Sequence, residues 1–233
     1  MKMILSCEHA TATIPEDYAG LFAEASHILK THQSYDIGAF EVGKMVEDLA
    51  EDAFYGKCNR LLVDLNRSLH HPRLFSAFSR GLSRSARELI VADWYYPFRT
   101  LVLHALDRTL AQHGEVLHIS IHSFTPILDG VVRPNDIGIL YDPGHHRERA
   151  WARRLAHAMR EVQPNLSVRM NCPYRGRSDS HTTALRRRFS KNVYLGIELE
   201  INQRLLEDDQ GRARVGKLLR DAFKKSGIGI SKK

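Results

Sequence analysis

Residues 193–202 read Val-Tyr-Leu-Gly-Ile-Glu-Leu-Glu-Ile-Asn, a short segment in which apolar and polar side chains alternate. Successive side chains of a β-strand point to opposite faces of its sheet. Glu198, Glu200 and Asn202 would therefore share one face, and the isoleucine and leucine residues between them would share the other. An apolar row of this kind indicates a strand buried in a sheet. Two carboxylates on such a strand are hard to explain as members of the hydrophobic core. The segment predicts a buried strand that carries acidic side chains to a site.

Three other segments have the same form, an apolar run that ends in polar residues, and they span residues 1–9, 60–67 and 116–122. The first ends in His9 and the last in His122. Ligands of an open α/β sheet bind outside the carboxyl ends of its strands. The four segments together therefore predict one site at one edge of a sheet.

The segment 60–67, Arg-Leu-Leu-Val-Asp-Leu-Asn-Arg, has the pattern of a strand. Asp64 and Asn66 would then lie on one face, and Arg67 would begin the exit loop. The guanidinium of arginine matches the two oxygens of a carboxylate, and an asparagine amide adds a neutral donor. The segment favours a carboxylate-binding site, and the alternative is a structural Asp–Arg pair that closes a loop.

Helical and strand patterns alternate along the rest of the chain. Strand patterns occur at 136–142 and 168–172, and helical patterns cover 36–50, 83–113, 147–162 and 212–225, the second of them interrupted at Tyr96-Pro97. No linker or repeat divides the sequence. The order predicts a single α/β domain over residues 1–233, with a mainly parallel central sheet.

The composition is that of an ordinary soluble protein, with 43% hydrophobic and 26% charged residues. No apolar run reaches the ~20 residues of a membrane span, and Glu8-His9 interrupts the only N-terminal apolar stretch, so no signal peptide is expected. Three widely spaced cysteines fit reduced thiols. We expect a cytoplasmic protein without a membrane partner.

The net charge of +7 suits either nucleic acid or an anionic small substrate. Basic residues are spread over 147–160, over Arg186–Arg188, which we expect on a helix surface, and over the lysine tail at 224–233. Aromatic residues are not interleaved with them, and no nucleic-acid motif is present. Nucleic-acid binding is not favoured.

Two histidines, a carboxylate ligand and a second carboxylate that acts as a base make a hydrolytic zinc site. His9, His122, Asp36 and Glu200 are the candidates for these parts. Asp36 has an alternative role as the N-cap of the helix that follows it. His118 shares a face with His122 but lies deeper, so we expect it to be buried.

Five motifs occur in an order and spacing that resemble the N-formylglutamate amidohydrolase family. The likeness runs from residue 3 to about residue 206, and the motifs are Ser6-Cys-Glu-His-Ala10, Asp36-Ile-Gly-Ala39, Val63-Asp-Leu-Asn-Arg67, His118-Ile-Ser-Ile-His-Ser-Phe-Thr-Pro126 and Ile197-Glu-Leu-Glu-Ile-Asn-Gln203. The resemblance implies a three-layer fold of the zinc-exopeptidase or phosphorylase/hydrolase type. It also implies a relation to zinc carboxypeptidases, aspartoacylases and zinc muramoyl-alanine amidases.

The same resemblance implies that His9 and His122 bind Zn²⁺ and that Asp36 is the third ligand. The carboxypeptidase pattern has its acidic ligand three residues after the first histidine, but position 12 of this chain is alanine. Glu8 and Glu41 therefore remain alternatives for the third ligand.

Glu200 fits the general base of the family best, with Glu198 as its neighbour and alternative. Asn66 and Arg67 would hold the α-carboxylate of an N-acylated acidic amino acid. Three loop arginines would hold a side-chain carboxylate or the oxyanion: Arg133, Arg175 and Arg177.

The sequence thus predicts a zinc-dependent amidohydrolase that cleaves a small anionic N-acyl amino acid such as N-formyl-L-glutamate. One alternative is a peptidase or cell-wall amidase that uses the same site. The other is a basic nucleic-acid-binding protein with a vestigial metal site.

Overall fold

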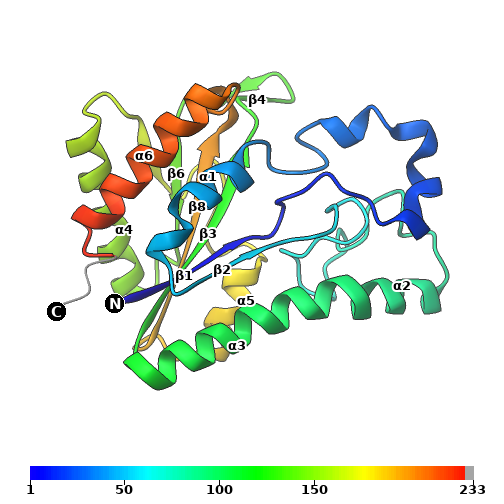
Figure 1. Cartoon of the computed structure of the whole chain (residues 1–233), viewed down its shortest axis with the longest axis horizontal. Coiled ribbons are helices and arrows are strands. Elements are labelled where there is room, and N and C mark those ends of the chain that lie inside the picture. Colours follow the sequence, from blue (N-terminus) through cyan, green and yellow to red (C-terminus); the bar gives the residue numbers. More distant parts are fainter. Residues whose placement is uncertain (229–233) are drawn as a thin grey trace.

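The structure is a computed structural model that describes residues 1–228; Lys232 and Lys233 of the basic tail lie outside these residues. Its centre is a six-stranded sheet with the strand order β2-β1-β3-β8-β6-β7 (Figure 1). The strands are β1 (Lys2–Cys7), β2 (Asp52–Tyr55), β3 (Val116–Phe124), β6 (Ile137–Leu140), β7 (Val168–Met170) and β8 (Tyr194–Asn202). A separate hairpin pairs β4 (Ile127–Leu128) with β5 (Val131–Val132).

The sheet is mainly parallel, as predicted. β2, β1, β3 and β8 run in the same direction, and β6 pairs with β8 in the antiparallel direction. The carboxyl ends of β1, β3 and β8 therefore meet at one edge of the sheet. The register of β3 and β8 sets His122 directly beside Glu200.

Helices cover both faces of the sheet (Figure 1). They are α1 (Ala39–Val46), α2 (Arg84–Ile90), α3 (Tyr96–His113), α4 (His146–Val162), α5 (His181–Arg188) and α6 (Asp209–Lys225). One face packs against α1, α4 and α6, and the other packs against α3 and α5. This is a three-layer α/β domain. Within the described residues, no helix has the length and apolarity that crossing a membrane requires.

The two faces of the central strands differ in chemistry. All nine residues of β3 and all nine of β8 are buried. Ile119, Ile121, Ile197 and Leu199 pack into the core cluster beneath α1, α4 and α6. The polar residues His118, Ser120, His122, Glu198 and Glu200 point to the opposite face, as their alternation predicts. Ser123 lies on the α1 side, where its hydroxyl donates to the Ile37 carbonyl.

The predicted strand at 60–67 is absent, and the segment is a loop. Its backbone closes turns instead, with Leu62 N–H donating to Asn59 O at 2.9 Å and Arg67 N–H to Asp64 O at 3.1 Å. Its apolar side chains are buried against α3, so the apolar run reflects core packing and not strand pairing. β2 occupies the edge of the sheet in its place.

The expected interruption at Tyr96-Pro97 is also absent, because a π-helix (Val91–Tyr95) joins α2 to α3. Proline lacks an N–H and its ring crowds the carbonyl four residues earlier. The wide turn relieves this crowding, and the Tyr96 N–H bonds to the Val91 carbonyl, five residues back. The helical region therefore continues through the proline.

Candidate active site

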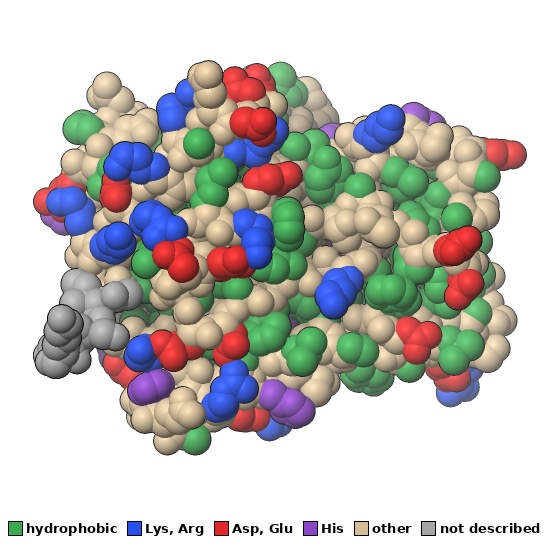
Figure 2. Space-filling view, viewed as in Figure 1, with side chains coloured by type: hydrophobic (Ala, Val, Ile, Leu, Met, Phe, Trp, Pro, Cys, Tyr) green, Lys and Arg blue, Asp and Glu red, His purple; other side chains and the backbone are tan. Residues whose placement is uncertain are grey.

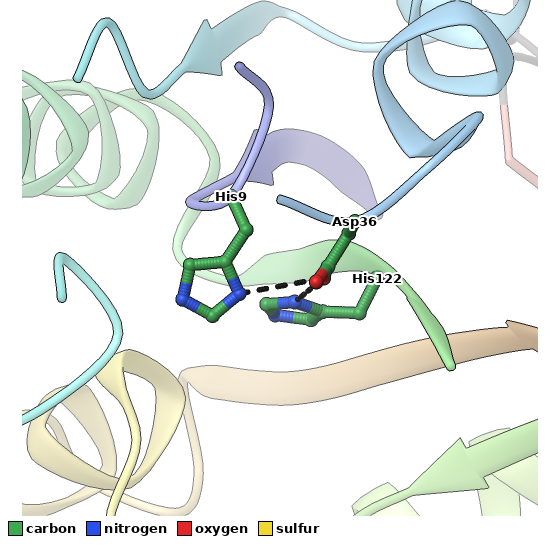
Figure 3. A group of neighbouring side chains, drawn as sticks. All are labelled: His9, Asp36 and His122. Atoms are coloured by element: carbon green, nitrogen blue, oxygen red, sulfur yellow. Dashed lines mark hydrogen bonds and ion pairs between the residues drawn. The ribbon is translucent and has the colours of Figure 1, made fainter. Parts of the chain in front are cut away.

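Three side chains with metal-ligating atoms meet at the carboxyl edge of the sheet (Figure 3). His9 follows β1, Asp36 precedes α1, and His122 lies on β3. Asp36 Oδ2 lies 2.8 Å from His122 Nδ1 and 3.4 Å from His9 Nδ1. The three ligand atoms lie within 4.8 Å of one another, and all three side chains are buried. The structure thus brings together the three residues that the sequence nominates as metal ligands.

The Asp36 side chain does not cap helix α1, so it can lie beside the two histidines. The N-cap of α1 is Gly38, whose φ of +78° favours glycine. The Asp36 backbone N–H donates to His9 O at 3.0 Å, which ties the segment before α1 to the end of β1. The N-cap role considered for Asp36 is therefore wrong.

The two alternative acidic ligands lie elsewhere. Glu41 is exposed on α1. Glu8 is buried, but its Oε2 lies 3.4 Å from His122 Nε2, the ring nitrogen on the side away from Asp36. Of the three carboxylates, that of Asp36 lies among the ligand atoms of both histidines.

The second nitrogen of each histidine has a fixed partner. His9 Nε2 lies 2.7 Å from Asp64 Oδ1, and His122 Nε2 lies 2.8 Å from Ser120 Oγ. Ser120 in turn donates to Glu8. Metal-binding histidines usually have such a partner on the far nitrogen, which fixes the tautomer and the ring orientation. The loop at 60–67 therefore contributes Asp64 as an anchor of His9, a role that the sequence did not reveal.

Arg60 lies between two of these carboxylates, at 3.3 Å from Asp36 and 3.3 Å from Asp64. Although burial opposes ionisation, His9 and Arg60 hold the pKa of Asp64 well below its usual range. Burial also opposes ionisation of Asp36, but His9 and His122 lower its pKa. Both carboxylates are therefore charged at neutral pH. Sequence reasoning missed Arg60, whose one local signal is its i,i+4 spacing from Asp64.

The two glutamates of β8 have different surroundings, although both are buried. Glu198 accepts hydrogen bonds from the hydroxyls of Ser180, at 2.7 Å, and Thr182. Glu200 Oε2 has no hydrogen-bond partner among the described residues. Burial raises the pKa of Glu200 to about 8. Glu200 is thus the carboxylate available to exchange a proton.

A cavity of about 580 Å³ opens over the trio. Asn66, Arg67 and Arg175 line it, as the sequence predicts. Asn66 Oδ1 accepts from the His181 backbone N–H at 2.7 Å, so its amide nitrogen remains for a ligand. The sequence did not identify several other lining residues: Arg60, His71, Arg73, Tyr174, Ser178, Asp179 and Ser180.

Two arginines expected at the site are not among the residues that line this cavity. Arg133 donates to the Tyr174 hydroxyl at 3.0 Å, and its guanidinium lies 5.2 Å from the centre of that ring. Arg177 pairs with Asp142 at 3.2 Å. Arg133 thus contacts Tyr174, which does line the cavity.

The basic cluster on α5 is not a continuous surface. Arg186, expected on the helix surface, is largely buried and pairs with the fully buried Glu148 at 2.9 Å. On the face shown in Figure 2, lysine and arginine side chains are interspersed with acidic ones. This arrangement gives no support to the nucleic-acid alternative.

A model of the family described as N-formylglutamate amidohydrolase matches residues 1–207. The chain belongs to the N-formylglutamate amidohydrolase family. Members of this family are hydrolases that act on amides, and this chain is therefore an amidohydrolase. The family match covers all of the residues that form the site.

Two solved structures resemble this member of the N-formylglutamate amidohydrolase family over 97% of its length. The gene product Atu2144 from Agrobacterium tumefaciens is 28% identical, with a TM-score of 0.81 and 90% of its own chain covered. The N-formylglutamate amidohydrolase from Ralstonia eutropha JMP134 is 16% identical, with a TM-score of 0.73 and 93% covered. The second likeness shows the fold alone. A comparison with curated proteins found no match.

Proposed function

We propose that the protein is a zinc-dependent amidohydrolase that removes the acyl group from a small N-acyl acidic amino acid, with N-formyl-L-glutamate as the first candidate. One observation carries the proposal. Two imidazoles and a carboxylate converge within 4.8 Å beside Glu200, whose Oε2 has no hydrogen-bond partner among the described residues, in a cavity lined by arginines.

The donor set fits zinc. Two histidine nitrogens and one carboxylate oxygen form a common ligand set of catalytic zinc, which leaves a further coordination position open. Asp64 and Ser120 anchor the outer nitrogens of the two histidines, as the partners of metal-binding histidines usually do. His9, Asp36 and His122 would hold the ion.

A zinc ion at this position would polarise the amide carbonyl and lower the pKa of a water molecule. Glu200 would take a proton from the attacking water on its carboxylate and deliver it to the leaving nitrogen. Glu200 stands beside His122 in the sheet register, and this proton transfer requires that it be ionised. Arg60 would keep Asp36 and Asp64 charged in their buried positions.

The cavity suits a small anionic substrate. A volume of about 580 Å³ is in the range of small-molecule pockets. Asn66 and Arg67 would bind the α-carboxylate, because an amide donor and a guanidinium suit a carboxylate together. Arg175, which also lines the cavity, would attract a second carboxylate. The protein from Ralstonia eutropha, an N-formylglutamate amidohydrolase, suggests the formyl group.

The test is elemental analysis of the purified protein, combined with an assay for formate release from N-formyl-L-glutamate. We expect about one zinc per chain and hydrolysis. His122→Ala should lose both, and His146→Ala, which changes an exposed histidine on α4, should keep both. Normal zinc content in His122→Ala would refute the ligand assignment, and hydrolysis that persists after zinc removal would refute the metal dependence.

A further inference from the structure

The end of the π-helix and the first turn of α3 direct two side chains, Tyr95 and Arg99, at the loop that carries Asn66 and Arg67. π-helical turns are rare, and those that occur are often found at functional sites. Tyr95, the last residue of this one, is buried, and its hydroxyl donates to the backbone carbonyl of Arg67 at 2.8 Å.

Arg99 supports the same loop one helical turn later. Its guanidinium donates to the carbonyl of Leu65 at 3.0 Å and to that of Arg67 at 3.3 Å. It also lies 5.0 Å from the centre of the Tyr95 ring, where cation–π attraction holds the two side chains together. Leu65 and Arg67 belong to no helix or strand, so side chains satisfy their carbonyls instead.

The opposite side of the loop is fixed as well. Arg67 donates through one amino group to the Asp179 carbonyl at 2.6 Å, and the Asp179 carboxylate accepts from Ser68 N–H at 2.9 Å. The backbone on both sides of Asn66 is therefore clamped between α3 and the segment before α5. Neither Tyr95 nor Arg99 is among the residues that line the cavity.

We propose that Tyr95, supported by Arg99, is a positioning residue for substrate binding. By holding the Arg67 carbonyl, it sets the direction in which the side chains of Asn66 and Arg67 enter the cavity. This inference rests on the proposed function, because it assumes that this pair binds the substrate carboxylate. Tyr95 acts on binding and leaves the metal ligands and Glu200 untouched.

The test compares Tyr95→Phe with Tyr96→Phe, which removes an exposed hydroxyl from the next position. In the zinc-loaded enzyme, Tyr95→Phe should raise KM for N-formyl-L-glutamate by about two- to ten-fold, the range expected for one lost hydrogen bond. Its kcat and zinc content should equal those of the wild type. Amide hydrogen exchange at residues 64–68 should become faster in Tyr95→Phe and stay unchanged in Tyr96→Phe.

Two outcomes would overturn the inference. One is unchanged KM in Tyr95→Phe, whatever the exchange rates. The other is a fall in kcat, which would indicate an effect on the reacting groups. If the wild type hydrolyses no N-acyl amino acid, the proposed function fails, and calorimetric binding of L-glutamate replaces KM. Equal affinity of the wild type and Tyr95→Phe for L-glutamate would then overturn the inference separately.

Discussion

Glu198 and Glu200 lie two residues apart on the same face of β8, but only Glu198 accepts hydrogen bonds from hydroxyl groups. Ser180 and Thr182 donate to Glu198, whereas Glu200 Oε2 has no partner among the described residues. We therefore predict that Glu200→Gln retains zinc and lowers kcat by about 100-fold or more, as loss of a general base does. Steady-state kinetics and metal analysis of the purified variant measure this.

Glu198→Gln is the matched control. Its hydroxyl partners can still donate to the amide oxygen, so kcat should fall by much less than in Glu200→Gln. A larger loss in Glu198→Gln would reverse the assignment of the base.

Metal binding should release protons. Although burial disfavours its charged form, hydrogen bonds to Asp36 and Glu8 raise the pKa of His122 well above its ordinary value. In the metal-free protein His122 is therefore protonated at pH 7, and so is Glu200, whose pKa is about 8. A metal ligand must be neutral imidazole, and a nearby cation lowers the pKa of a carboxyl group.

We predict that zinc uptake at pH 7 releases roughly two protons in the wild type and roughly one in Glu200→Gln. Since both groups give up protons on binding, zinc affinity should rise with pH. Calorimetry in buffers of different ionisation enthalpy measures the number of protons. Equal proton release by the two proteins would mean that metal binding does not change the ionisation state of Glu200.

At the scale of the elements, β6 and the loop after β7 approach so closely that only glycine fits between them. A Cβ atom on Gly138 would lie 1.9 Å from the Cys172 carbonyl oxygen and 3.3 Å from the Glu200 Cβ. Gly138→Ala should therefore lower the free energy of unfolding by about 2 kcal/mol, within the range known for overpacking. We expect thermal unfolding to show a Tm lower by about 4–8 °C.

Gly20→Ala is the control for this change, since a Cβ at Gly20 meets nothing within 4 Å. Its Tm should equal or slightly exceed that of the wild type. A wild-type Tm for Gly138→Ala would mean that the Cys172 carbonyl lies farther from β6 than the structure shows.

The central strands were predictable because the apolar residues in their sequences are the ones that pack into the core. β1, β3 and β8 are apolar on one face and buried, and the expected helices at 147–162 and 212–225 match α4 and α6 closely. The apolar run at 60–67 has the same appearance, but its side chains fill the core beside α3 while its backbone turns. Local sequence does not distinguish these two ways of burying leucine and valine.

Relations between distant segments were not predictable. The antiparallel direction of β6 depends on how the chain crosses the sheet, and the short α-helix at 181–188 depends on its packing against β8. His9 and His122 were predictable because each follows or ends an apolar run typical of a strand, and Asp36 was nominated from the family resemblance. Arg60, Tyr95 and Arg99 were missed because their partners are loop atoms whose positions the pattern does not fix.

At the scale of the whole molecule, positive charge should assist binding. The protein carries a net charge of +7, and Arg60, Arg67, Arg73 and Arg175 line the cavity. Salt shortens the range over which these charges attract an anion, from ~10 Å at 0.1 M to ~3 Å at 1 M. We predict that kcat/KM falls more steeply with added NaCl for N-formyl-L-glutamate than for N-formyl-L-glutamine, which has one charge fewer.

Parallel kinetic titrations of the two substrates test this prediction. The substrates have nearly the same size, so a difference in slope reports the extra carboxylate. Identical slopes would mean that the cavity arginines do not recognise a second negative charge.

The position of β8 has a consequence for biosynthesis. This strand lies in the middle of the sheet, between β3 and β6, yet it ends at Asn202, after both of its neighbours have been synthesised. Until β8 leaves the ribosome, β3 lacks its partner on one side, and unpaired strand edges invite association with other chains. A nascent chain that extends past residue 122 but not to residue 200 contains His9, Asp36 and His122 but lacks Glu200. Such a chain could bind a metal ion before Glu200 is synthesised. The site would then be complete only after β8 has joined the sheet.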